Sequence, residues 1–290
     1  MEMVTVDEVR PDSRLYTALE QGNILLFTRP PWEIPAADQD FLRSISQTGR
    51  AYHKNIAYRP ESDKVTGFDP KGLDDPEKLR AVLRRFSQSA LGFLRQFVPR
   101  YMEASRIDYA SFRGIEEEGR DLAFKKRNDL LHIDAFPTRP TGGDLILRTF
   151  VNIHPTRSRV WLTSDPFAPL AREHAVAAGW PRMASWEGLT RLVTRRTAYD
   201  RFMLRFHDYL KRNHQYQQNC RKYRWEFPPG AVWMVFTDIV PHAVLSGQHA
   251  LEQTVIVPHR NLLTPASAPV EILRSLRGAG LRPADADSGA

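Results

Sequence analysis

The 290-residue sequence contains one cysteine, Cys220, and this scarcity excludes two kinds of stabilising site. A single thiol forms neither an internal disulfide nor a multi-cysteine zinc site. A bound metal ion would therefore need histidine and carboxylate ligands. The sequence also lacks the ~18 to 20 uncharged apolar residues that a membrane-spanning helix requires. Its start, MEMVTVDEVRPDSRLY, lacks the basic region and apolar run of a secretory signal. We therefore expect a soluble, cytoplasmic protein.

Acidic residues are the minority among the charged side chains, and the formal net charge is +7. One segment, residues 181–225, holds eleven Lys/Arg against three Asp/Glu. This balance favours an anionic partner such as nucleic acid, an anionic membrane surface or an acidic small molecule. Aromatic side chains alternate with these cations, as in helices that lie on anionic headgroups. A solvated helix face has the same composition, so both interpretations stay open.

The hydrophobic pattern predicts mainly helices before about residue 120. Residues 22–28 form an apolar run ended by prolines, which indicates one early strand. Residues 34–46 and 74–98 have helical periodicity, and the second of these segments starts with the aspartates and proline that favour a helix N-terminus. We expect this second helix to pack one face on a sheet.

Six short apolar runs follow, separated by turns rich in proline and glycine. Several short strands with such turns favour an antiparallel barrel or sandwich over alternating βαβ units. Residues 184–213 have a helical pattern and would form an insertion between the strands. The predicted strands cover residues 130–136, 144–153, 159–163, 231–238, 242–247 and 251–258.

We expect a single domain over residues 1–265, with its helical insertion at about 170–225. Residues 266–290 are expected to form a C-terminal helix and a disordered tail. The tail prediction follows from the small and polar composition of the last residues, RGAGLRPADADSGA.

His132 and Asp134 lie one residue apart in the apolar sequence LLHIDAF, so on a strand both side chains point to the same face. That geometry suits two ligands of one metal ion, but a buried histidine hydrogen-bonded to an aspartate has the same pattern. His242, at the start of a later predicted strand, could supply a third ligand, with His249 as its rival. Two histidines and one carboxylate are the ligands of non-haem Fe(II) oxygenases, and catalytic zinc accepts them too. His207 is expected at the surface or in helix packing.

Arg148 lies inside the predicted strand DLILRTFVNI. A guanidinium among apolar side chains is costly unless it pairs with an anion, and a carboxylate matches its fork of N–H groups. The partner is either a protein acid such as Asp144 or the distal carboxylate of 2-oxoglutarate, unless the side chain is exposed on an edge strand. Asn152 shares the face of Arg148 and could bond the same cosubstrate or only end the strand.

These positions resemble the Fe(II)/2-oxoglutarate dioxygenase superfamily. Two longer stretches, LLHIDAFPTRPTGGDLILRTFVNIHP and PPGAVWMVFTDIVPHAVLSGQHALEQT, resemble the hydroxylases of Kdo, 3-deoxy-D-manno-octulosonic acid. The resemblance, over roughly residues 15–265, implies an α+β chain with a double-stranded β-helix (jelly-roll or cupin-like) core, flanking N-terminal helices and a helical insertion. It implies Fe(II), 2-oxoglutarate and O2, with His132, Asp134 and His242 as the catalytic and metal-binding residues. The implied reaction is hydroxylation of C3 of Kdo in lipid A-linked lipopolysaccharide precursors.

The resemblance departs at the residue that anchors 2-oxoglutarate. Many members of the superfamily carry a basic anchor about ten residues after the distal histidine, but Glu252 occupies that position here. Other branches place the anchor on the strand that follows the H-x-D motif. The resemblance therefore assigns cosubstrate binding to Arg148, with Asn152 beside it and Arg260 as the fallback.

The implied partner is a Kdo-containing lipid A precursor, and no nucleic acid is expected. The basic segment 181–225 would then hold the enzyme peripherally on the cytoplasmic face of the bacterial inner membrane. Residues 125–127, KKR, would lie near the mouth of the site and recognise sugar carboxylates, or remain solvated. Two alternatives stay open: a 2-oxoglutarate-dependent hydroxylase of a peptide or nucleic-acid base, and a non-enzymatic basic module with a cupin-like barrel.

Overall fold

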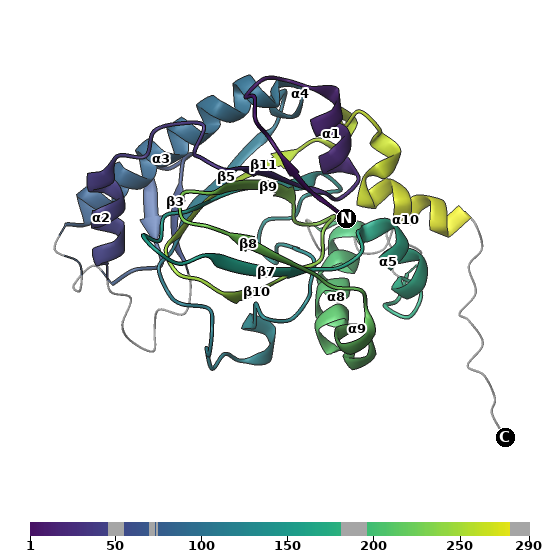
Figure 1. Cartoon of the computed structure of the whole chain (residues 1–290). Coiled ribbons are helices and arrows are strands. Elements are labelled where there is room, and N and C mark those ends of the chain that lie inside the picture. The colour runs from purple at the N-terminus through teal and green to yellow at the C-terminus, as the bar shows by residue number, and fades with distance from the viewer. Residues whose placement is uncertain (46–54, 70–72, 74, 181–195, 279–290) are drawn as a thin grey trace.

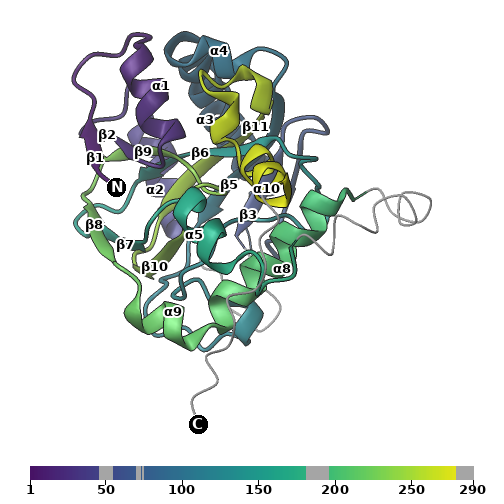
Figure 2. The same ribbon diagram turned by 90° about the vertical axis from the view of Figure 1, so that its right-hand side faces the viewer.

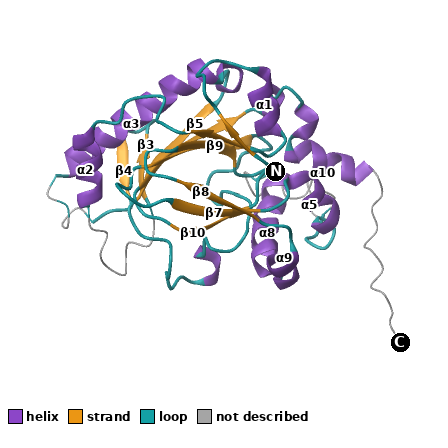
Figure 3. Cartoon of the chain, in the orientation of Figure 1, coloured by secondary structure: helices purple, strands orange, loops and turns teal. Residues whose placement is uncertain are grey.

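A computed structural model describes residues 1–45, 55–69, 73, 75–180 and 196–278 of the chain (Figure 1). The strands form a large sheet and a three-stranded sheet, which face each other as the predicted barrel or sandwich requires (Figure 3). Apart from the parallel pair β1 and β2, neighbouring strands run antiparallel. In spatial order the large sheet contains β1 (Met3–Thr5), β2 (Ile24–Phe27), β9 (Val232–Phe236), β6 (Leu145–Asn152), β11 (Ala250–Val257), β5 (Arg106–Arg113), β3 (Ile56–Arg59) and β4 (Lys64–Thr66), and the small sheet contains β10 (His242–Ser246), β7 (Arg159–Thr163) and β8 (Tyr223–Phe227).

Helices cover the side of the large sheet that faces away from the small sheet, and others close one end of the molecule. The first group includes α1 (Ser13–Glu20), α3 (Pro76–Phe97) and α4 (Pro99–Met102), and α8 (Ala198–Arg212) lies at the end (Figures 1 and 2). Among the described residues, none of the helices has the length and apolar composition needed to cross a bilayer. The remaining elements are α2 (Ala36–Ser44), α5 (Phe167–His174), α9 (His214–Asn219), α10 (Pro269–Gly278), and the 3-10 turns η1 (Phe124–Lys126), η2 (His259–Asn261) and η3 (Pro265–Ser267).

Helix α3 forms as the sequence predicts. The side chain of Asp75 accepts a hydrogen bond from the backbone N–H of Lys78, and Pro76 occupies the first turn, where its missing N–H costs nothing. The apolar stripe from Leu79 to Phe97 is buried against β3, β5 and β11. This packing removes the stripe from water, which is the main source of stability for an amphipathic helix.

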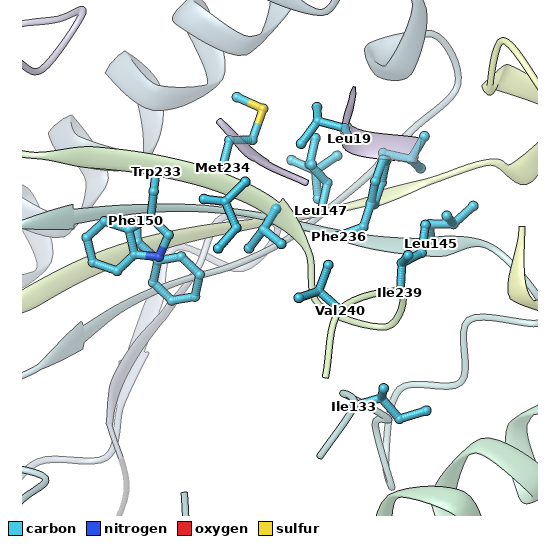
Figure 4. Close-up of a cluster of buried hydrophobic side chains, with 14 of the residues drawn as sticks. Leu19, Ile133, Leu145, Leu147, Phe150, Trp233, Met234, Phe236, Ile239 and Val240 are labelled. Carbon is cyan, nitrogen blue, oxygen red and sulfur yellow. The ribbon is translucent and has the colours of Figure 1, made fainter. Parts of the chain in front are cut away.

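Aromatic side chains join the two sheets. The rings of Phe150 on β6 and Trp233 on β9 stack with their centroids 5.1 Å apart, and Figure 4 shows them side by side. Trp161 of the small sheet meets both rings edge-on, at 5.0 and 5.6 Å. Offset and edge-to-face contacts of this kind stabilise a core beyond the area that they bury. They also fix the spacing between the sheets.

The structure corrects several secondary-structure predictions. Residues 130–136 do not form a strand, and only a single bridge from His132 to His242 links this extended segment to β10. The prediction missed β1, β3, β4 and β5, which lie before residue 120. It also missed β8, which begins inside the range assigned to the helical insertion. The predicted helix over 184–213 is described only from residue 196, where α8 occupies most of the range. The predicted disordered tail beyond α10 lies outside the described residues.

Candidate metal and cosubstrate site

Backbone hydrogen bonds bring together two histidines that lie far apart in the sequence. The N–H of His132 donates to the carbonyl of His242 at 3.1 Å, and the N–H of His242 donates back at 2.9 Å. Two residues later, the N–H of Asp134 donates to the carbonyl of Thr237 at 2.9 Å. These bonds hold the extended segment beside β10 although it has no continuous ladder. As a result the imidazole centroids of the two histidines are 4.8 Å apart.

The side chains of His132, Asp134 and His242 form one cluster. Each offers a ligand atom, and these atoms lie within 4.8 Å of one another. Both histidines are 5% exposed. Among the described residues, this cluster is the one set of three or more His, Cys, Asp or Glu side chains whose spacing suits a metal ion.

The hydrogen bonds of the two imidazoles fix their tautomers. Nδ1 of His132 lies 2.7 Å from the carbonyl oxygen of Leu130, and Nδ1 of His242 lies 2.9 Å from that of Val240. Because a carbonyl oxygen only accepts, each Nδ1 carries the proton and each Nε2 keeps its lone pair. Burial lowers the pKa of His132 well below its ordinary value and also lowers the pKa of His242. Both imidazoles are therefore held in the neutral form that binds metal.

Asp134 completes the donor set. Its Oδ2 atom is buried and has no hydrogen-bond partner. The nearest basic groups are Arg148 Nη2 at 3.2 Å and His242 Nε2 at 3.9 Å. Burial alone would raise the pKa of Asp134, but Arg148 and the two imidazoles hold it below its usual range. A carboxylate oxygen that accepts no hydrogen bond, beside two imidazole lone pairs, fits a divalent ion with mixed nitrogen and oxygen ligands, as iron prefers.

Arg148 contacts a second acid in addition to Asp134. Its Nη1 atom lies 3.3 Å from Oε1 of Glu252 on the neighbouring strand β11. On the other side of β11, Nε of Arg113 donates to Oε2 of Glu252 at 2.9 Å. Burial raises the pKa of Glu252, but the two guanidinium groups outweigh it and lower the pKa to about 2. Arg148 therefore contacts protein acids, although not Asp144, whose Oδ1 lies 3.3 Å from Nδ1 of His259.

A cavity of about 340 Å³ opens beside these groups. It shares Arg148 with the histidine and aspartate cluster, so it belongs to the same site. Another cavity, of about 290 Å³, lies between α5 and α9 and is lined by none of the cluster residues. The charged lining of the larger cavity consists of Arg113, Arg120, Lys126, Arg139, Arg148 and Glu252. A lining with five cations and one acid suits anionic ligands.

Arg113 is the site residue that sequence reasoning missed. It ends β5, and its side chain is 12% exposed. The signal in the sequence was weak, because RIDYASFR alternates polar and apolar residues and carries an arginine at each end. Only the pairing of β5 with β11 brings Arg113 next to Glu252.

Two predicted cosubstrate residues lie elsewhere. Both N–H groups of the Asn152 amide donate to backbone carbonyls, of Arg157 and Phe227, at 2.9 Å each, and its oxygen accepts from the N–H of His154. Asn152 thus stabilises a loop and does not line the cavity. Arg260 is exposed in η2, outside the cavity lining. The structure therefore brings Arg148 to the metal cluster, but not Asn152 or Arg260.

His207 and His249 are the two other histidines that the sequence brought into consideration. His207 on α8 lies at the site, with its ring centroid 4.8 Å from that of His132 and its Nδ1 atom 2.7 Å from the carbonyl oxygen of Ile133. It therefore supports the segment that carries the cluster. His249 has a positive φ of 56° and stacks with His154 at 5.6 Å, away from the cluster.

Several side chains of the basic segment 181–225 are buried, although its composition suggested an exposed surface. Its residues 181–195 lie outside the described part of the chain. In the described part, Lys211 is 4% exposed and its Nζ donates to the carbonyl of Lys125 at 3.3 Å. The aromatic residues Tyr199, Phe202, Phe206 and Tyr216 are buried in the core. These four aromatic side chains therefore do not contribute to the basic and aromatic surface that was one of the two interpretations of this segment.

Comparisons with a family model and with solved structures find matches over nearly the whole chain. A family model described as 3-deoxy-D-manno-oct-2-ulosonic acid (Kdo) hydroxylase matches residues 4–280. The apo structure of the Kdo hydroxylase KdoO, a non-heme Fe(II) alphaketoglutarate dependent dioxygenase, is 31% identical with a TM-score of 0.83, and the match covers 96% of each chain. KdoO with alphaketoglutarate and Fe(III) matches at 30% identity, 96% coverage of each chain and a TM-score of 0.83. KdoO with cobalt(II) matches at 30% identity, 99% coverage of each chain and 0.83. The comparison with curated proteins finds no match.

These likenesses confirm the fold prediction. A chain that superposes on KdoO over nearly its full length has the predicted α+β architecture with a double-stranded β-helix core. The flanking N-terminal helices are α1, α2 and α3. The expected cofactor and cosubstrate classes are also those of the KdoO structures.

Proposed function

The chain belongs to the Kdo hydroxylase family, and on that premise we propose that it hydroxylates C3 of Kdo in lipid A-linked lipopolysaccharide precursors. It is an Fe(II)/2-oxoglutarate-dependent dioxygenase, and hydroxylation of Kdo is the reaction of its family. The attacked carbon and the lipid-linked form of the sugar are our proposal. The observation that supports it most is the cluster of His132, Asp134 and His242 at an arginine-lined cavity. Membership of an enzyme family also argues against the alternative of a non-enzymatic basic module with a cupin-like barrel.

Three side chains would hold the iron in this proposal. The ligand atoms are Nε2 of His132, Nε2 of His242 and a carboxylate oxygen of Asp134, since these are the atoms that the hydrogen bonds leave available. When bound, the iron with 2-oxoglutarate and O2 supplies the oxidising chemistry that exchanges hydrogen for hydroxyl. The chain positions the reactants and limits water: the indole of Trp161 stacks on His242 with centroids 5.2 Å apart.

Arg148 and Arg113 would bind the distal carboxylate of 2-oxoglutarate. Both line the cavity, and both guanidinium groups are nearly buried, at 11% and 12% exposure. A guanidinium binds a carboxylate through two parallel N–H bonds, and a low local dielectric strengthens that contact. Glu252 holds the two arginines in place and leaves the trio with one net positive charge, which matches one carboxylate.

Mass spectrometry of lipid A with its core sugars tests the proposed function. Cells or extracts that contain the protein should show a gain of one oxygen atom on Kdo, and fragmentation should place it at C3. A variant that carries both His132→Ala and Asp134→Ala provides the control, because it should produce no gain. A gain on a peptide or a nucleic-acid base, with unmodified Kdo, would replace the substrate and favour the alternative hydroxylase.

We also propose that exposed cations of α8 and of the loop between α9 and β8 hold the enzyme on the cytoplasmic leaflet. Arg205, Arg212, Arg221 and Lys222 are exposed, while the aromatic side chains of this region are mostly buried. The attraction would therefore be electrostatic and sensitive to salt. Co-sedimentation with phosphatidylglycerol vesicles should fall in the variant Arg212→Glu/Lys222→Glu and at high salt. Equal binding to neutral vesicles, or none to anionic ones, would remove membrane contact from the proposal.

A further inference from the structure

The cavity contains more positive charge than the proposed cosubstrate site uses. Arg113 and Arg148 share Glu252 at its inner end, beside the metal cluster. Arg139 and Lys126 line the same cavity, and Arg139 pairs with Asp108 and not with Glu252. Arg120 also lines it and pairs with Glu117 at 3.1 Å. A second anion could therefore enter while the inner arginines are occupied.

Aromatic rings hold Arg139 rigidly. Its guanidinium carbon lies 3.9 Å from the ring centroid of Tyr109 and 4.2 Å from that of Phe136. Its Nη1 atom bonds the carboxylate of Asp108. Contact with aromatic rings leaves the edge of a guanidinium as its binding surface. The ring of Phe136 also lies 5.5 Å from the guanidinium carbon of Arg148, so it stands between the inner and outer cations.

Lys126 differs from the lysine beside it. Both lie in η1, but Nζ of Lys125 lies 3.4 Å from Asp208 and its carbonyl accepts from the buried Lys211. Lys126 lines the cavity, and its ammonium pairs with no acid in the described part of the chain. Its backbone N–H donates to Ala123 at 2.7 Å, which fixes the turn. The unneutralised charge of η1 therefore faces the cavity.

We propose that Lys126 and Arg139 form a second anion subsite, which binds the carboxylate of the sugar acid substrate. This inference rests on the proposed function and extends it to substrate recognition. In a 3-deoxy-2-ulosonic acid the carboxyl carbon C1 is bonded to C2, which is the neighbour of C3. When C3 is presented for hydroxylation, the carboxylate must therefore lie inside the same cavity. A lipid phosphate is separated from C3 by a glycosidic link and a further sugar ring, so it lies farther out.

Binding measurements on adjacent lysines test the subsite. The probe is the methyl α-glycoside of Kdo, which has one carboxylate and no phosphate, titrated into the cobalt(II)-loaded protein with 2-oxoglutarate. Loss of a charge-assisted hydrogen bond should raise Kd by about 10-fold or more in Lys126→Gln. The matched control, Lys125→Gln, removes the same charge from the same turn and should change Kd less than about twofold. Equal effects of the two variants would overturn the inference.

A second arm identifies the group that the subsite binds. The carboxamide of the same glycoside keeps its shape and removes its charge. For the wild-type protein the amide should bind weaker by at least the factor lost in Lys126→Gln. Amidation should cost less affinity in the variant than in the wild type, because the two changes share the Lys126 contact while the Arg139 contact remains. Arg139→Lys, which keeps the charge but loses the stacked fork, should weaken binding of the carboxylate more than of the amide.

The remaining outcomes separate this inference from the function on which it rests. If 2-oxoglutarate binds the wild-type protein but the glycoside does not, the Kdo assignment fails and the subsite fails with it. If the glycoside binds and Lys126→Gln has no effect, the subsite is wrong while the function stands. If the amide binds as well as the carboxylate, and a lipid A disaccharide bisphosphate without Kdo competes, the cations serve phosphate and the carboxylate assignment is overturned.

Discussion

Nη1 of Arg148 lies 3.3 Å from Oε1 of Glu252, across two neighbouring strands of the large sheet. Glu252 also binds Arg113 from the strand on its other side. The sheet thus places one acid between two cations, at a position where many members of the superfamily are expected to carry a cation. In the proposed cosubstrate site the positive charge therefore comes from the flanking strands, and Glu252 would orient the two arginines.

Glu252→Gln should destabilise the ligand-free protein by about 3 kcal/mol, because it leaves two nearly buried guanidinium groups without their shared charge. 2-Oxoglutarate should restore more stability in this variant than in the wild type, since its carboxylate supplies the missing charge. Thermal unfolding of cobalt(II)-loaded protein with and without 2-oxoglutarate measures both effects. The control is Glu226→Gln, which removes an exposed acid paired with Arg224 and should change little. A smaller ligand-induced shift in Glu252→Gln would contradict the orienting role.

The 2-oxoglutarate anchor can be assigned by three single substitutions. Arg148→Ala and Arg113→Ala should each raise the Kd of 2-oxoglutarate about 10- to 100-fold, because each removes a charge-assisted contact. Arg260→Ala should leave the Kd within about twofold, since Arg260 is exposed and outside the cavity lining. Calorimetry on cobalt(II)-loaded protein gives the affinities, and circular dichroism shows whether the variants fold. Weak binding in Arg260→Ala alone would transfer the anchor to η2.

The sequence was sufficient for the parts of the site that lie within one segment. The pair His132 and Asp134 can be predicted because a spacing of two puts both side chains on one face of an extended chain, whether or not that chain forms a full strand. Arg148 is readable because a cation inside an apolar strand needs a partner. Helix α3 is readable from its periodicity and its capping residues.

The parts that depend on pairing between strands could not be predicted. Arg113 becomes a site residue only because β5 pairs with β11, and that register is not encoded near Arg113. His207 was expected at the surface or in helix packing, and its contact with the carbonyl of Ile133 depends on how α8 docks against that segment. Asn152 shares the face of Arg148 but lies four residues farther along the strand. There its side-chain amide makes hydrogen bonds to the backbone of Arg157, Phe227 and His154, so none is left for a cosubstrate.

Removal of one residue of the proposed metal cluster should abolish metal binding. His132→Ala should lose bound cobalt(II) or iron(II), because two protein ligands hold a divalent ion far more weakly than three. Metal content after dialysis, measured by plasma mass spectrometry, gives the result. His214→Ala, on the exposed face of α9, is the matched control and should keep its metal. Normal folding with unchanged metal content in His132→Ala would mean that the cluster is not the metal site.

The buried carboxyl group of Asp238 should make the stability of the metal-free protein depend on pH. It is 1% exposed, its Oδ1 accepts from the N–H of Ile146 at 3.1 Å, and its Oδ2 has no partner. Burial raises the pKa of Asp238 to about 7, from 3.8 in an unfolded chain. Below about pH 4 both states keep the proton and the group costs nothing. Between about pH 4 and 7 only the unfolded chain releases it, so stability falls as the pH rises.

Asp238→Asn removes this titration and keeps the acceptor for Ile146. The free energy of unfolding of the variant, relative to the wild type, should therefore increase between pH 4 and pH 8, by about 4 kcal/mol at most. Urea unfolding at the two pH values, with a chelator present, measures the difference. Asp7→Asn, at an exposed carboxylate, should stay within about 0.5 kcal/mol of the wild type at both. If the advantage of Asp238→Asn is the same at pH 4 and pH 8, then the carboxyl is already ionised in the folded protein, and an unseen cation or water must satisfy Oδ2.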